Sequence, residues 1–141
     1  MKNKFIVLLL SLIFISILSM LIISNYRKAV ANREEFNKEY LSLYNKEILG
    51  TELISTINKT SDNNEKNGVE KDEDNVYIEN ETKSVKIYIK FLDSPDTFQM
   101  EAISNGGIEN FVKYYAGYKF KCTNIEYHKN GNVKSIYFEQ T

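Results

Sequence analysis

Hydrophobic residues follow three different patterns along the chain. Up to about residue 26 they are almost continuous, and no charged residue lies between Lys4 and Arg27. From residue 28 to residue 49 they recur at helical spacing, and after residue 76 they alternate with polar residues in short runs. These patterns are typical of a membrane-spanning helix, an amphipathic helix and half-buried strands, respectively. The sequence therefore predicts an apolar N-terminal helix followed by an α+β domain.

The N-terminal apolar segment is long enough to cross a bilayer. It runs from Phe5 to Ile23 and is interrupted only by Ser11, Ser16 and Ser19. Roughly 20 residues rising 1.5 Å each span the ~30 Å hydrocarbon core, and serine hydroxyls can bond back to carbonyls of their own helix. We therefore expect Phe5 to Ile23 to contact the lipid bilayer as a single transmembrane helix.

A cleaved signal peptide is the main alternative for this segment. Such peptides have an apolar core of about 7–15 residues and a cleavage site with small residues. Ala29-Val30-Ala31 matches that site, but Arg27 and Lys28 interrupt the approach to it. The length of the segment favours a retained anchor, and cleavage near Ala31 stays open.

Positive charge is distributed nearly evenly on the two sides of this helix, so the charge count alone does not decide its orientation. Lys2 and Lys4 precede the apolar segment, while Arg27, Lys28 and Arg33 follow it. A short N-terminal tail before a long apolar segment behaves like a signal anchor. We therefore expect a single-pass protein of the cell membrane, with its N-terminus inside and its domain outside.

Residues 28–49 are predicted to form an amphipathic helix. Gly50 suits the C-terminal stop of that helix, and Thr51 suits the cap of a second short helix from Glu52 to about Asn58. Residues 59–75 are too polar to enter a core and indicate a loop. The apolar stripe of the first helix consists of Phe36, Tyr40, Leu43, Tyr44 and Ile48.

Strand patterns begin after this loop. Val76-Tyr77-Ile78 and the alternating run Val85 to Phe91 are predicted to form a hairpin. Ser94-Pro95 marks either a turn or a helix start, because proline is accepted in the first helical turn. The Gly106-Gly107 pair then interrupts the chain before the next element.

The last third of the chain contains a short helix and a second hairpin. Ile108 to Tyr115 has apolar residues at i, i+3, i+4 and i+7, which indicates an amphipathic helix. Tyr118 to Tyr127 and Val133 to Glu139 are predicted to be strands, and Asn130-Gly131 between them favours a type I′ turn.

The expected organisation therefore has four parts. Residues 1–26 form an N-terminal tail and transmembrane anchor, 27–59 a helical stalk, 60–75 an acidic polar loop, and 76–141 an antiparallel β-rich domain packed with the stalk. The fold class is α+β, with a small antiparallel sheet of about four strands and a short helix.

Composition excludes several classes of function. Lys and Arg total 18 against 19 Asp and Glu, which excludes a strongly cationic nucleic-acid binder. Cys122 is the only cysteine, so an intrachain disulfide is impossible. Cys122 and His128 lie about 20 Å apart if their strand is straight, a distance too long for a catalytic dyad. One cysteine and one histidine are also too few ligands for a zinc site. We expect a buried Cys122 and a surface His128.

Two further groups of polar residues are interpreted as solvated surface. Asp93 and Asp96 flank Pro95 in a turn, where nothing indicates the burial that acid–base chemistry requires. The C-terminal region has a mildly basic aromatic surface, more typical of an ordinary solvated face than of a nucleic-acid site. We expect no catalytic, cofactor-binding or metal-ligating residue. The residues of the basic aromatic surface are Lys113, Lys119, Lys121, Lys129 and Lys134, interleaved with Tyr114, Tyr115, Tyr118 and Tyr127.

Two segments resemble small N-terminally anchored membrane proteins of Gram-positive bacteria, which have no assigned function. Gly50 to Lys59, followed by Asp62-Asn63-Asn64, is similar to one stretch of these proteins. Phe120-Lys121-Cys122 with Ile125 to His128 is similar to their C-terminal hairpin. The resemblance implies an anchored topology for most of the chain.

The order of elements is also similar to that of type IV pilins and pseudopilins, in which a hydrophobic helix leads into an amphipathic helix and an antiparallel sheet. Pilins have a glycine before the cleavage point and a glutamate five residues into the mature helix. Here Lys4 precedes Phe5, and Leu9 occupies the glutamate position. This departure argues against pilin-type processing.

Three functions remain as hypotheses. The first is a non-enzymatic, single-pass anchored protein whose extracytoplasmic domain contacts a protein partner in the cell envelope. The second is a pilin-like or pseudopilin-like envelope subunit. The third is a small membrane-bound hydrolase or a binding module for a cell-wall ligand.

Overall fold

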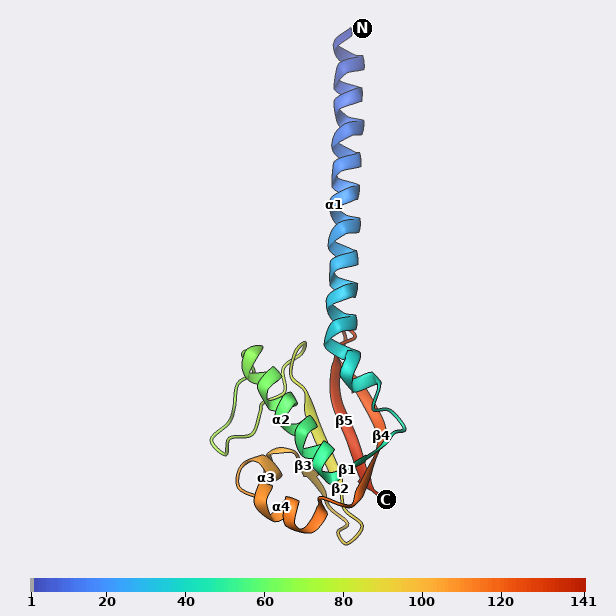
Figure 1. The fold of residues 1–141 in the computed structure, drawn as a ribbon. Helices are drawn as coiled ribbons and strands as arrows, with labels where there is room; N and C mark the ends of the chain where they lie inside the picture. Colours follow the sequence, from blue (N-terminus) through green and yellow to red (C-terminus); the bar gives the residue numbers. More distant parts are fainter. Residues whose placement is uncertain (1) are drawn as a thin grey trace. The chain divides into compact units, whose positions relative to one another are not determined.

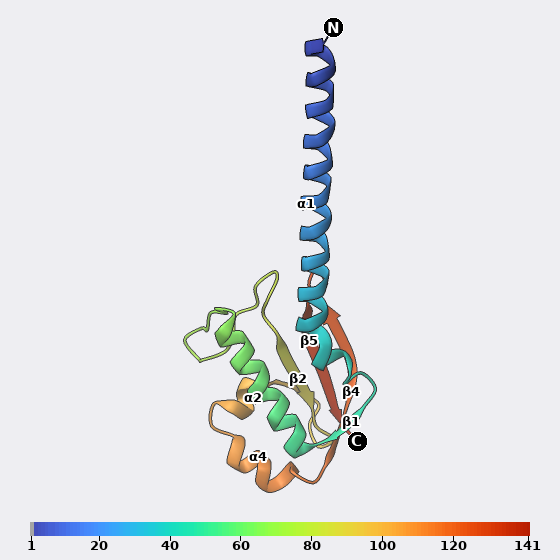
Figure 2. The ribbon, with the colours of Figure 1, turned by 45° about the horizontal axis from the view of Figure 1, so that its top comes forward.

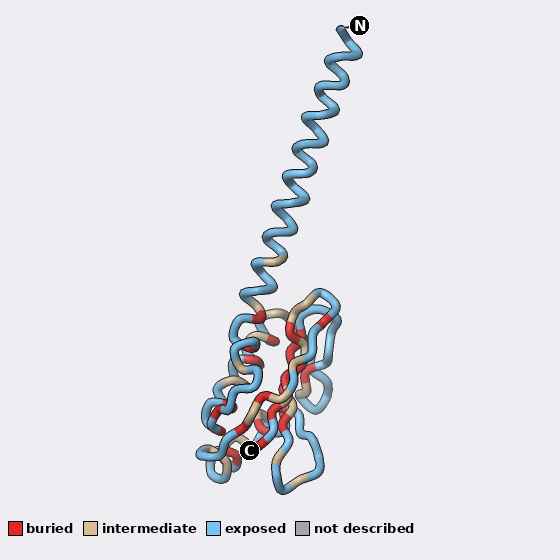
Figure 3. The backbone as a smooth tube through the Cα atoms, turned by 90° about the vertical axis from the view of Figure 1, so that its right-hand side faces the viewer, coloured by how far each residue is buried: buried red, intermediate tan, exposed pale blue. Residues whose placement is uncertain are grey.

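The structure, a computed structural model, describes residues 2–141 in two compact units. The first unit ends at Glu35, and the second runs from Phe36 to Thr141. Helix α1 (Lys2–Leu41) contains the whole described first unit and also supplies the first residues of the second. Figure 3 shows that the first unit is almost entirely exposed, whereas buried residues gather in the second.

Serines in the apolar part of α1 satisfy their hydroxyl groups within the helix. Ser11 Oγ donates to Val7 O at 2.9 Å, and Ser19 Oγ donates to Ile15 O at 2.9 Å. These bonds make the serines compatible with an apolar environment, as expected from the sequence.

Helix α1 ends at Leu41, well before the expected end at residue 49. Asn45 has a φ of 61°, and its N–H donates to Cys122 O at 3.0 Å. The following residues form strand β1 (Glu47–Leu49), in which Ile48 is buried. The predicted helix over 28–49 is thus too long, because the apolar position of Ile48 suits a strand as well as a helix.

Helix α2 (Gly50–Lys66) extends beyond both ends of the predicted second helix. Gly50 starts this helix instead of ending α1, and Thr51 does not cap it. The helix continues through the first part of the expected 60–75 loop because Thr60 and Asn64 are fully buried and Asn64 bonds to Val85. The polar residues of that segment therefore include two that pack inside the domain.

The sheet confirms the α+β class but is mixed and has five strands. Besides β1, its strands are β2 (Lys86–Lys90), β3 (Thr97–Gln99), β4 (Lys119–Tyr127) and β5 (Val133–Gln140). The strand order is β1-β4-β5-β2-β3, and only the β2–β5 pair of strands is parallel.

The predicted hairpin between Val76–Ile78 and Val85–Phe91 does not form. Tyr77 makes only an isolated bridge with Lys71, and β2 pairs instead with β5 and β3. Alternation identifies the buried face of a strand but carries no information about its partner, so it could not predict the parallel pairing.

The closing hairpin of β4 and β5 forms as predicted, with a different turn. Gly131 has a φ of 89°, but Asn130 does not adopt a positive φ, so the turn is not type I′. An irregularity between Cys122 and Asn124 shifts the register, so that Cys122 pairs with Phe138 and Ile125 with Ile136. This bulge lets Cys122 and Ile125 both contribute to the core, although three positions separate them.

Helices α2, α3 (Glu101–Ser104) and α4 (Ile108–Tyr115) complete the domain. Figures 1 and 2 show α2 and α4 on the same side of the sheet. The bounds of α4 match the sequence-based prediction. The largest fully buried apolar side chains are Phe120, Phe138, Leu53, Ile57, Ile87, Ile89, Met100 and Ile136.

Candidate functional site

The first candidate feature is the apolar part of α1. This helix is long and apolar enough to cross a membrane, and none of its most apolar stretch is buried in the protein. Side chains such as Phe14 and Ile22 remain 62% and 67% exposed. The same properties belong to signal sequences, so the segment is compatible with either a membrane anchor or a signal sequence.

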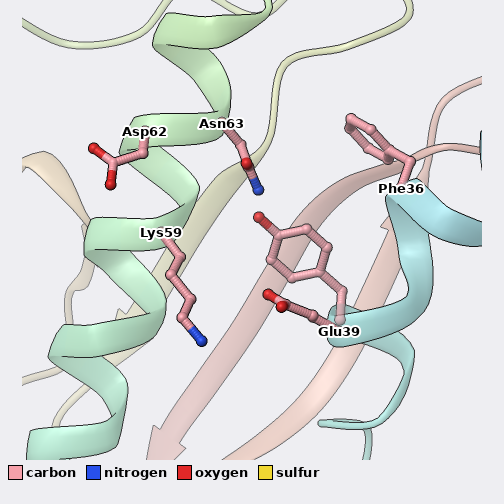
Figure 4. A pocket seen from close by; sticks show the side chains of 6 residues that line it. Phe36, Glu39, Lys59, Asp62 and Asn63 are labelled. Atoms are coloured by element: carbon pink, nitrogen blue, oxygen red, sulfur yellow. The ribbon is translucent and has the colours of Figure 1, made fainter.

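The second feature is a groove between the end of α1 and α2, called here the α1–α2 groove. It consists of two adjoining hollows of about 340 and 240 Å³ that share Glu39, Tyr40 and Lys59. In Figure 4, Lys59 and Asn63 extend from α2 toward α1, and Glu39 extends from α1 toward α2. The remaining lining residues are Phe36, Ser42, Leu43, Thr56 and Asp62.

The floor of the α1–α2 groove is fixed by Tyr40, which is 4% exposed. Its hydroxyl group lies 2.9 Å from Thr60 Oγ1, a buried hydrogen bond between the two helices. Burial raises the pKa of the Tyr40 hydroxyl, so this group stays neutral at physiological pH. A buried aromatic floor beside exposed charges of both signs is a surface suited to contact with another polar molecule.

The third feature is a buried ion pair that the sequence did not reveal. Lys86 and Glu101 are each 2% exposed, and Lys86 Nζ pairs with Glu101 Oε1. Lys86 Nζ also donates to Tyr77 O at 3.1 Å, and Tyr77 N–H donates to Glu101 Oε1 at 3.2 Å. The alternating pattern predicts that Lys86 lies on the exposed, polar side of its strand. Such a pattern cannot distinguish an exposed lysine from one that a distant segment covers.

The buried pair is a structural connection between three segments of the domain. It links β2 to the start of α3, and the backbone of Tyr77 bonds to both charged groups. Glu101 Oε2 is buried and has no hydrogen-bond partner among the described residues. This second carboxylate oxygen is the one buried polar side-chain atom in residues 2–141 without a partner.

Cys122 is buried as predicted, whereas the surface position predicted for His128 is wrong. Burial raises the pKa of the Cys122 thiol to about 11. His128 is only 6% exposed, and its Nε2–H donates to Ser84 O at 2.7 Å. This bond ties the β4–β5 turn to the segment before β2. No hydrogen bond connects the thiol and the imidazole in the part of the chain that the structure describes.

The predicted solvated groups lie at the surface. Asp93 and Asp96 are exposed, and Asp96 N–H donates to Ser94 Oγ at 3.2 Å within the turn. Lys113, one lysine of the basic aromatic surface, lies with Nζ 5.4 Å from the ring centre of Tyr114. Of the two alternatives for Ser94-Pro95, the turn is the one that forms, since these residues lie outside any helix.

Tyrosines beside this turn line a further cavity of about 340 Å³, called here the tyrosine cleft. Tyr114 and Tyr118 are 60% and 54% exposed, although both are aromatic. The cleft is lined by Leu92, Asp93, Tyr114, Tyr115, Tyr118 and Gln140.

The described residues contain no group of three or more His, Cys, Asp or Glu side chains arranged to hold a metal ion. Neither a protein-family model, nor a curated protein, nor a solved structure matches the chain.

Proposed function

We propose that this chain is a non-enzymatic, single-pass membrane protein, and that its domain binds a protein partner in the cell envelope outside the cytoplasm through the α1–α2 groove. One observation carries the membrane assignment. The apolar side chains of the first unit are exposed, while the second unit encloses a complete hydrophobic core of its own. An apolar helix that its own domain does not cover requires another apolar environment, which a bilayer supplies.

The length of the chain between the anchor and the groove supports contact near the membrane surface. Ile23 is the last residue of the expected membrane segment, and Phe36 is the first residue that lines the groove. The residues between them reach at most about 45 Å when fully extended. The partner would therefore lie within a short distance of the bilayer.

The chemistry of the groove supports binding more than catalysis. Its charged side chains include Glu39 and Lys59, which are exposed to solvent instead of being desolvated as acid–base catalysis usually requires. The described residues that line the groove include no cysteine or histidine. A rim of exposed charges around a half-buried aromatic residue such as Phe36 is typical of a protein–protein contact.

The anchor is tested by the state of the mature protein in a bacterial host. Membranes are washed with alkaline carbonate, and the mass of the intact chain is measured. Retention of the full mass in the membrane pellet supports the anchor. A soluble chain that begins after Ala31 would identify a signal peptide, and cleavage between Lys4 and Phe5 would support the pilin-like alternative instead.

Orientation and contact are tested by two further measurements. Protease added outside spheroplasts should remove a tag placed after Thr141, and protection of that tag would reverse the orientation. A photoreactive amino acid at Lys59 should crosslink to a specific membrane or envelope protein. The matched control is Asn58, which is also exposed on α2 but does not line the groove. Equal crosslinking from both positions would refute the groove as the binding surface.

A further inference from the structure

The tyrosine cleft is assembled from three segments that are distant in the sequence. Leu92 and Asp93 follow β2, Tyr114 and Tyr115 end α4, and Gln140 ends β5. Tyr118, in the turn after α4, completes the lining. The cleft lies on residues outside the α1–α2 groove and shares no lining residue with it.

The walls of the cleft are held in place by packing and hydrogen bonds. The ring centre of Tyr115 lies 4.8 Å from that of Phe91 and 5.3 Å from that of Phe111. Leu92 N–H donates to Gln140 Oε1 at 3.1 Å, and Tyr118 N–H donates to Tyr115 O at 3.0 Å. The ring of Tyr115 is therefore already oriented before a ligand binds, which reduces the entropy lost on binding.

The electrostatics of the cleft favour a cation. Among the described residues that line it, Asp93 is the only charged one, and it is negative. The face of a tyrosine ring also carries negative potential and attracts ammonium groups within about 6 Å. Lys113, which does not line the cleft, has its Nζ 5.4 Å from the ring centre of Tyr114, so a bound cation would share this ring with that lysine.

The supply of hydrogen-bond acceptors narrows the type of cation. A primary ammonium group has three donors and needs several acceptors when it leaves water. The cleft offers the Asp93 carboxylate and the hydroxyl oxygens of its three tyrosines as acceptors, while Gln140 Oε1 already accepts from Leu92, and the rest of the tyrosine surface is aromatic ring. A methylated ammonium group has no such need and is held by ring faces and one opposite charge.

We propose that the tyrosine cleft binds a quaternary ammonium group, with the rings of Tyr114, Tyr115 and Tyr118 around the methyl groups and Asp93 as counter-charge. This inference does not depend on the proposed anchor or on the α1–α2 groove. It adds a small-molecule site to a domain proposed above to bind a protein.

The test is a titration of the full-length protein in a neutral maltoside detergent, with choline chloride as the ligand and tyrosine ring NMR signals as the readout. Choline should shift the signals of Tyr114, Tyr115 and Tyr118 in a saturable way. The neutral isostere 3,3-dimethyl-1-butanol, ethanolamine and equal sodium chloride should produce much smaller shifts. The Tyr127 signal is the internal control, since Tyr127 is 49% exposed but lies outside the cleft.

Variants separate the charge of the cleft from its rings. Asp93→Asn and Tyr118→Leu should each weaken choline binding about tenfold, because they remove the counter-charge or one ring. Tyr127→Leu should leave it unchanged. N-acetylglucosamine oligomers, as a glycan ligand, are titrated in the same way. The proposal is overturned if choline gives no saturable shift in the wild type or if the neutral isostere binds as well as choline. It is also overturned if only the N-acetylglucosamine oligomers shift these signals. The wild-type titration needs no variant, so a folding defect in one of them leaves the proposal open to refutation.

Discussion

The side-chain amide of Asn64 pairs with both polar backbone groups of Val85. Asn64 Nδ2 donates to Val85 O at 2.8 Å, and Val85 N–H donates to Asn64 Oδ1 at 3.0 Å. Both residues are fully buried. A residue of α2 thus satisfies the backbone just before β2, whereas within a sheet these backbone groups bond to a neighbouring strand.

Replacement of Asn64 by Leu should destabilise the domain by about 2–4 kcal/mol, because the N–H and C=O of Val85 would remain buried without partners. Denaturant unfolding of the full chain in detergent, followed by far-UV circular dichroism, measures this change. Asn58→Leu is the control, because Asn58 is exposed on the same helix. A change in unfolding free energy as small as that of the control would show that the Asn64–Val85 pair contributes nothing.

Replacement of Gly50 by Ala should also destabilise the domain, for a steric reason. A Cβ atom on Gly50 would lie 2.0 Å from Tyr115 O and 2.8 Å from Tyr115 C, both backbone atoms that cannot rotate away. We expect a loss of about 3 kcal/mol, measured by the same unfolding experiment.

Gly117→Ala provides the matched comparison for Gly50. A Cβ atom there would have no neighbour within 4 Å, and Gly117 does not have a positive φ. This substitution should be neutral or stabilise the domain by about 0.5 kcal/mol through the unfolded state. Similar losses for both alanine variants would contradict the steric explanation.

Local patterns predict the elements that depend on near neighbours. The helix from Ile108 to Tyr115 and the closing hairpin around Gly131 both form, because their periodicity and turn residues act within a few positions. The sequence pattern also identifies Gly50 as a boundary between elements. It places Gly50 at the end of the first helix, whereas Gly50 begins α2. The real constraint on Gly50 is the carbonyl of Tyr115, which no local pattern can indicate.

The buried polar residues that the sequence does not predict depend on contacts between distant segments. Its local patterns assign Asn64 to a loop, Lys86 to the exposed side of a strand, and His128 to the surface beside a turn. Each is buried, and each has a polar side-chain atom bonded to a segment at least 9 residues away in the sequence. Composition and alternation describe how polar a residue is, but a buried polar residue is defined by its partner.

The buried pair of Lys86 and Glu101 should show strong coupling in a double-mutant cycle. Lys86→Met alone should cost about 3–5 kcal/mol, because it leaves the Glu101 carboxylate buried without its counter-charge. The double variant Lys86→Met with Glu101→Leu should lose less than the sum of the two single changes. Additive losses would show that the two charges do not interact.

The exposed pair of Lys134 and Glu79 is the reference for that cycle. Its atoms Nζ and Oε2 are 3.8 Å apart, and the two side chains are 35% and 42% exposed. We expect a coupling of at most about 1 kcal/mol for this pair, since water screens it. A coupling as large as that of the buried pair would contradict the role assigned to burial.

Cys122 should be unreactive in the native protein and should make stability depend on pH in the alkaline range. Its thiol has a pKa raised from 9.0 to about 11 by burial, so the folded state disfavours the thiolate. Because the pKa is about two units higher, the folded chain has about 100-fold less thiolate at pH 8 than the unfolded chain. Reaction of Cys122 with a disulfide reagent should therefore be at least about 100-fold slower in the native protein than in denaturant. Because Cys122 is the only cysteine, the reagent reports on one site.

The sign of the pH effect follows from the same shift. Below about pH 9 the thiol is neutral in both the folded and the unfolded chain, and its contribution to stability is complete. As the pH rises through 9 toward 11, the unfolded chain loses this proton first, so the contribution is progressively lost. Burial raises the pKa of several tyrosines as well, so tyrosines of the unfolded chain also ionise first in this range, and Cys122→Val serves as the reference that isolates the thiol. The unfolding free energy of the wild type minus that of Cys122→Val should fall as the pH rises from about 9 to about 11. A difference that stays constant over this range would show that the thiol is not desolvated.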